Sequence, residues 1–144
     1  MRRLFSNIRK NADGAAAIEF ALIAPMLFGL MLGVLQIGIA MQNYNALRSV
    51  SADVARYAVV NYQTSTRLSV SQLQDYAYSV GTTAPYALQR QNLTTSVRMA
   101  TTQRVTGATE YTIALTYNVP SVLSVIGIGN IPLSYSRPIF VVSS

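Results

Sequence analysis

Side chains that could carry out catalysis or bind a metal are scarce in this sequence. Cysteine and histidine are absent, which removes imidazole and thiolate metal ligands, disulfides, cysteine nucleophiles and histidine-based triads. The acids after Glu19 are far apart, and we expect each to be a solvated surface acid; they are Asp53, Asp75 and Glu110. The sequence therefore predicts no enzyme, no cofactor and no small-molecule substrate, and only a carboxylate cluster formed by folding would revive a small exported enzyme as a hypothesis.

One acid has an unusual position. Glu19 stands directly before a run, residues 20–35, in which no side chain is polar, and the next charge after it is Arg48. An ionised carboxylate costs about 2 to 4 kcal/mol near the bilayer centre and less at an interface, so it usually has a partner. The residues alone leave two interpretations open: an interfacial glutamate that reaches headgroup water, or a charge that pairs with another group.

The element that positions Glu19 is the apolar stretch 15–41. As a helix it would be about 40 Å long, which is enough for a hydrocarbon core of about 30 Å. The residues before it are basic and include Arg2, Arg3, Arg9 and Lys10. Basic residues that flank a span stay on the cytoplasmic side, so we predict a cytoplasmic N-terminus and an exported chain after Met41. The alternative is a secretory signal cut near residues 38–40, although the apolar run is longer than the core of such signals.

A family resemblance rests on the order of these features. The basic leader ends at Gly14, small residues follow, and Glu19 is the fifth residue after that glycine, at the start of a long apolar helix. This layout resembles the processing site of type IV prepilins. More narrowly, the sequence resembles the TadE-like proteins of the Tad (Flp) pilus system, in AAAIEFALIAP and in a later ARYA motif. The matching positions after Glu19 include Pro25, Ala55, Arg56, Tyr57 and Ala58.

The resemblance implies a processing and assembly role. A prepilin peptidase would cleave between Gly14 and Ala15 and leave the apolar segment as an anchor. Glu19 would then compensate the N-terminal ammonium of a neighbouring subunit. Pro25 removes a backbone donor and is expected to kink the helix. The implied partners are the prepilin peptidase, other Tad pilus subunits, inner-membrane assembly proteins and membrane lipid.

The formal net charge of +6 does not indicate a nucleic-acid-binding protein. Half of this charge lies in residues 1–14, and the later arginines are spread singly along the chain. A domain that binds DNA or RNA gathers its basic side chains on one face. We therefore expect no nucleic-acid partner.

Periodicity predicts an α+β fold. The helix continues after Met41 with an apolar stripe at spacings of three and four to about residue 62; the stripe consists of Tyr44, Leu47, Val50, Ser51, Val54, Tyr57 and Ala58. This amphipathic half is expected to pack on the chain's own sheet. A second short helix is predicted over about 72–80, with a capping box that starts at Ser71 and a stop at Gly81.

Alternating apolar residues predict a small antiparallel sheet. The expected strands are 93–99, 110–119 and about 133–142, with Gly107 in a hairpin turn. Pro138 places the last strand at an edge or a bulge. The expected architecture is a long N-terminal helix, transmembrane in its first half, packed on a three-stranded sheet with one or two short helices.

These expectations define four segments: a cleaved cytoplasmic leader (1–14), a transmembrane helix (15–41), its amphipathic continuation (42–62) and an exported α+β domain (63–144). The favoured function is a minor pilin or pseudopilin-like subunit of a Tad pilus, needed for assembly and surface adhesion. It would be a single-pass protein of the bacterial inner membrane, with its C-terminal domain in the periplasm or, once assembled, outside the cell. The alternative is an anchored periplasmic scaffold protein of the secretion machinery that never polymerises.

Overall fold

The computed structural model describes residues 12–63 and 68–142, so most of the basic leader lies outside the described residues. Its elements in chain order are α2 (Ala12–Gln63), α3 (Val70–Thr82), η1 (Arg90–Asn92), β1 (Leu93–Met99), β2 (Ala108–Val119), η2 (Ser124–Ile126) and β3 (Ile131–Val142). The chain forms two compact units, Met1–Ile37 and Gly38–Ser144. The predicted α+β class is confirmed, with one long helix, one further short α-helix and a three-stranded sheet.

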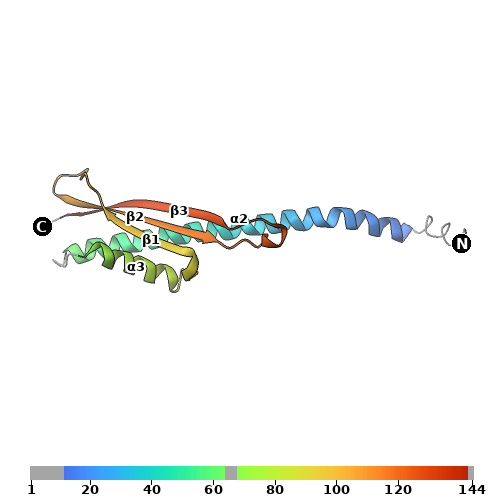
Figure 1. The fold of residues 1–144 in the computed structure, drawn as a ribbon, viewed down its shortest axis with the longest axis horizontal. Helices are drawn as coiled ribbons and strands as arrows, with labels where there is room; N and C mark the ends of the chain where they lie inside the picture. Colours follow the sequence, from blue (N-terminus) through green and yellow to red (C-terminus); the bar gives the residue numbers. More distant parts are fainter. Residues whose placement is uncertain (1–11, 64–67, 143–144) are drawn as a thin grey trace, which may run out of the picture. The chain divides into compact units, whose positions relative to one another are not determined.

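In the second unit, the three strands form an antiparallel sheet in the order β1-β2-β3 (Figure 1). Leu93 of β1 pairs with Tyr117 of β2, and Thr112 of β2 pairs with Pro138 of β3. β3 is thus an edge strand, as Pro138 predicts, because proline cannot donate to a ladder on both sides. Gly107, in the connection before β2, has a φ of +81°, which a glycine adopts without steric cost.

The core of this unit lies between the helices and one face of the sheet. Alternate residues of β2 are almost fully buried, and they are Tyr111, Ile113, Leu115, Tyr117 and Val119. From α2 the fully buried residues are Leu47, Val50, Ser51, Val54 and Ala58. The predicted stripe is therefore confirmed as the face that packs on the chain's own sheet. One residue of the predicted stripe differs, because Tyr44 is exposed.

The second helix is correctly placed but its ends differ from the prediction. The capping box starts at Ser69 and uses Gln72, so the expected start at Ser71 is wrong by two residues. Gly81 lies inside α3 and does not end it. A Cβ at this position would lie 2.8 Å from Leu93 Cδ2, so the glycine allows close contact between α3 and β1.

Glu110 corrects another expectation, because it is not a solvated acid. It is 3% exposed, and its carboxylate accepts from Arg104 Nε at 2.9 and 3.0 Å and forms a salt bridge with Arg104 Nη2. Arg104 lies in the connection that precedes β2. Its hydrogen bond with the carboxylate holds the pKa of Glu110 below its usual value.

Candidate functional site

The first unit presents an apolar helical surface. One helix of the described chain is long and apolar enough, by length and composition, to cross a membrane. Large apolar side chains along it are more than half exposed, and they are Ile18, Phe20, Leu22, Ile23, Met26, Leu27, Phe28, Leu30, Met31, Val34, Leu35 and Ile37. Such a surface is unfavourable in water and suits lipid or neighbouring helices.

Glu19 is the acidic group on this surface. It is exposed and stands in α2 beside Ile18 and Phe20, which are 65% and 63% exposed. Residues 12–37 contain no lysine or arginine, so this part of the first unit supplies no basic side chain to neutralise the carboxylate. A partner for Glu19 at membrane depth is therefore not found among the side chains of residues 12–37.

The expected cleavage site lies near the start of α2. The helix begins at Ala12, so Gly14 and Ala15 are both helical, and both are exposed. A Cβ built on Gly14 would meet no atom within 4 Å. The bond between these residues is thus unobstructed by the described part of the chain, and its processing stays a prediction.

Proline and glycine positions follow along the same helix. Pro25 lies inside α2, which is helical from Ala12 to Gln63. A Cβ built on Gly29, Gly33 or Gly38 would meet nothing within 4 Å. Glycines with open space beside them allow another helix backbone to approach closely. The predicted kink at Pro25 and a packing role for these glycines remain predictions.

The ARYA motif has a clear place in the core of the second unit. Ala58 is fully buried and Ala55 is packed against the core. The ring of Tyr57 stacks on Tyr76 of α3, with centroids 3.8 Å apart and planes 12° apart. Arg56 is the exposed member, and its Nη1 lies 3.9 Å from Asp53 Oδ1. The motif therefore joins α2 to α3, and its arginine forms a surface ion pair with Asp53.

Asp53 has a second contact that the sequence does not reveal. Its Oδ2 accepts a hydrogen bond from the Tyr86 hydroxyl at 2.8 Å. This bond, together with burial, raises the pKa of Tyr86 above its usual value, because the carboxylate favours the protonated phenol. The contact ties the segment after α3 to α2.

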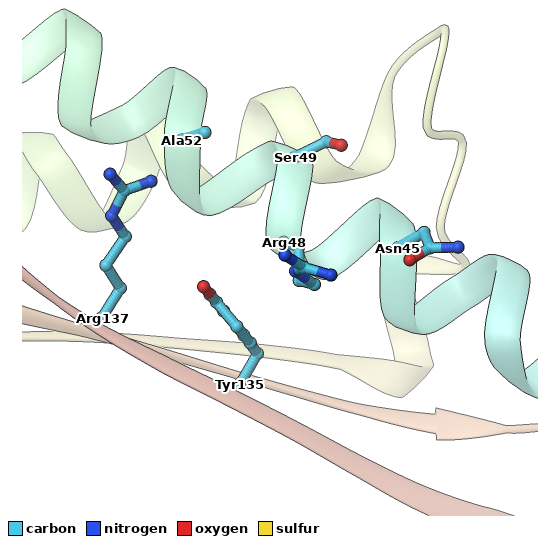
Figure 2. Close-up of a pocket in the computed structure, with 6 residues that line it drawn as sticks. All are labelled: Asn45, Arg48, Ser49, Ala52, Tyr135 and Arg137. Atoms are coloured by element: carbon cyan, nitrogen blue, oxygen red, sulfur yellow. The ribbon is translucent and has the colours of Figure 1, made fainter.

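A polar groove of about 410 Å³ lies between α2 and β3. Figure 2 shows Arg137 and Tyr135 reaching from β3 toward α2, where Arg48 lines the same groove. The other lining residues are Asn45, Ser49 and Ala52. Sequence reasoning missed this groove, because Arg48 and Arg137 meet only through the packing of the helix on the edge strand.

Acidic residues form no cluster in the part of the chain that the structure describes. Glu110 is bound by Arg104 and Asp53 by Tyr86 and Arg56, while Asp75 is exposed on α3. Within residues 12–63 and 68–142, no group of three or more histidine, cysteine, aspartate or glutamate residues could hold a metal ion.

Comparison with protein families identifies the N-terminal part of the chain. Residues 14–56 match the TadE-like protein family, which confirms the resemblance over these residues, from Gly14 through Arg56. No curated protein and no solved structure matches the chain. The matched family is associated with the Tad pilus system, and together with the apolar helix the match indicates membrane anchoring.

Proposed function

We propose that this protein is a minor pilin or pseudopilin-like subunit of a Tad (Flp) pilus, processed by a prepilin peptidase and needed for pilus assembly and surface adhesion. The observation that carries the proposal is the match to the TadE-like family over residues 14–56. That range contains Glu19 and the apolar helix, and it ends at Arg56 of the ARYA motif. The features that would anchor and assemble a subunit thus fall within the matched range.

Processing would occur on the cytoplasmic side. The basic residues of the leader favour retention of the N-terminus in the cytoplasm, and cleavage between Gly14 and Ala15 would remove them. The apolar helix would remain as the anchor in the inner membrane. The α+β domain would then lie in the periplasm, or outside the cell in the assembled pilus.

Glu19 would act after cleavage, when Ala15 carries a free ammonium group. Residues 12–37 offer no basic side chain to Glu19, so the N-terminus of a neighbouring subunit is a suitable partner. In the membrane interior an unpaired carboxylate is costly, and a paired one is attracted more strongly than in water. The pairing would set the axial register between neighbouring helices.

The location of the mature chain tests this function. Pili sheared from intact cells are compared with the inner-membrane fraction, using an antibody to the α+β domain, in wild-type cells and in cells lacking this protein. We expect the protein in the sheared fraction at low copy number and no pili in its absence. If pili are absent without the protein but the sheared fraction never contains it, the protein is an anchored scaffold that does not polymerise. If pili form normally without it, the proposed function is wrong.

A further inference from the structure

The groove between α2 and β3 holds positive charge that the described chain does not balance. Arg48 and Arg137 both line it and both are exposed. The salt bridges of residues 12–63 and 68–142 involve Arg56 and Arg104, and neither groove arginine takes part in one. The hydroxyl of Tyr135 and the amide of Asn45 add hydrogen-bonding groups to the same lining. Two guanidinium groups beside such donors suit an oxyanion.

Arg137 occupies a position that normally holds an apolar residue. Along β3 the odd-numbered residues face the helices, and Ile139 and Val141 of this series are buried. Arg137 and the half-buried Tyr135 continue the same face. A charged side chain on the inner face of a sheet is uncommon unless it has a partner. No described carboxylate lies within salt-bridge distance of Arg137, so its exposed guanidinium is open to an anion from another molecule.

Among the described acids of the second unit, one has a free carboxylate. Glu110 is bound to Arg104, and Asp53 accepts from Tyr86. Asp75 is exposed on the outer side of α3, and none of the hydrogen bonds or ion pairs of the described residues involves its side chain. The two groove arginines and the free carboxylate therefore lie on separate surfaces, and Arg90 and Arg98 are likewise exposed without a salt bridge among the described residues.

We propose that the groove binds the Asp75 carboxylate of a second copy of this chain. α3 packs on β1, whereas the groove lies at β3, the opposite edge of the sheet. The two surfaces are different patches at opposite edges, so each copy can offer its α3 to one neighbour and its groove to another. Such a head-to-tail contact joins two copies through different patches on each of them. This inference deepens the proposed function and rests on it for its biological use.

The structure also predicts the axial offset between the two copies. α3 runs antiparallel to α2, since Tyr76 stacks on Tyr57 and a Cβ at Gly81 would lie 3.8 Å from Val50. Asp75 is therefore near the level of Tyr57, while the groove spans Asn45 to Ala52 along α2. At about 1.5 Å per residue, the copy that supplies Asp75 is displaced in the direction of the N-terminal end of α2, by about 8 Å to reach the level of Ala52 or about 14 Å to reach the level of Arg48.

Membrane lipid is the competing source of an oxyanion. A lipid phosphate and a protein carboxylate share the oxyanion chemistry that two guanidinium groups bind. The crosslinking test therefore has a separate outcome for lipid.

Cysteine crosslinking in the membrane tests the contact. The chain has no cysteine, so engineered cysteines are the only thiols. One full-length copy carries Asn45→Cys in the groove, and a second, differently tagged full-length copy carries Ser79→Cys, one turn from Asp75 on α3. Asn45 is about one helical turn before Arg48 on α2, and Ser79 is about one turn after Asp75 on α3. Because α3 runs antiparallel to α2, both cysteines are shifted in the same direction from the charges that are proposed to pair. The two copies are co-expressed in a bacterial host without Tad pilus genes and treated with a short bismaleimide.

We expect a crosslinked pair that depends on both charges. Asp75→Asn in the α3 copy, or Arg137→Gln in the groove copy, should lower the crosslinked fraction about fivefold to tenfold. Asp75→Arg in one copy, combined with Arg48→Asp and Arg137→Asp in the other, should restore it. The matched control pairs Ser79→Cys with Thr116→Cys, an exposed position on the opposite face of the sheet, and should not crosslink.

Two results would overturn the proposal. One is a crosslinked fraction that does not change with Asp75→Asn. The other is a crosslink that does not form, combined with a lipid signal in native mass spectrometry. If phosphatidylglycerol stays bound to the wild-type protein and is lost from Arg137→Gln, the groove binds lipid. Because the host makes no pili, a failure here does not affect the proposed pilus function, which the sheared-fraction experiment tests separately.

Discussion

Replacement of Glu19 by glutamine should impair assembly and leave the other steps intact. The substitution keeps the size of the side chain and removes its charge. Glu19 is exposed, and its own helix offers no basic side chain over residues 12–37. We therefore expect the fold and the membrane insertion to be independent of the carboxylate, and pairing with a neighbouring N-terminus to require it.

The size of the effect follows from a competition within the mature chain. The ammonium of Ala15 is four residues before Glu19 on the same helix, a rise of about 6 Å. At an effective dielectric constant of about 20, the attraction is about 4 kcal/mol at 4 Å and about 3 kcal/mol at 6 Å. If the carboxylate stays about 6 Å from its own ammonium, a neighbour's ammonium in direct contact is preferred by about 1.4 kcal/mol, which is about tenfold per contact.

Pilus counts and processing are measured in the same cells. With Glu19→Gln we expect about tenfold fewer pili per cell by electron microscopy, with unchanged membrane insertion and unchanged mobility of the processed chain on a gel. Gln42→Ala, an exposed polar residue at the other end of the span, is the matched control and should leave pili unchanged. Normal pilus numbers with Glu19→Gln would refute the charge-pairing argument.

Three further predictions concern processing and the second unit. Gly14→Leu should block cleavage, because the peptidase would meet a bulky side chain at the scissile bond. A Gly14→Leu chain with the same gel mobility as the processed wild-type chain would contradict this. Leu47→Ala should lower the free energy of unfolding in detergent by about 2 to 5 kcal/mol. The control Val60→Ala, at a position that is 51% exposed, should change this free energy by less than about 0.5 kcal/mol. Equal effects of the two substitutions would show that Leu47 is not in the core. The lowered pKa of Glu110 adds stability that is fully present above the usual glutamate pKa of 4.5 and is lost as pH falls through the pKa of the folded protein. Glu110→Gln should therefore be less stable than wild type at neutral pH but not in acid. An equal loss of stability at both pH values would contradict the ion pair.

Much of the fold is visible in the sequence, because each element buries only one face. The strict alternation of β2 and the three-and-four spacing of α2 are direct consequences of one-sided burial. Val54 and Ile113, for example, are both fully buried, as their patterns predict. Pro138 likewise predicts the edge position of β3 without any tertiary information.

The differences arise where packing decides between local alternatives. The segment SVSQLQ contains two possible capping boxes, and burial of Leu73 and Ala77 accompanies the register that starts at Ser69. Glu110 is at a position that alternation assigns to solvent, yet Arg104 from the preceding loop covers it. The groove of Arg48 and Arg137 depends on an edge strand meeting a distant helix. Sequence periodicity carries no information about such contacts.

The N-terminal residue of the mature protein tests the central claim most directly. The membrane fraction is prepared from a strain with its prepilin peptidase and from one without it, and the protein is analysed by N-terminal sequencing and intact mass. A chain that begins at Ala15 only when the peptidase is present is the predicted result. A chain that begins at Met1 in both strains, or at Met41, would contradict the account, because no free ammonium would then exist at Ala15 for a neighbouring Glu19 to bind.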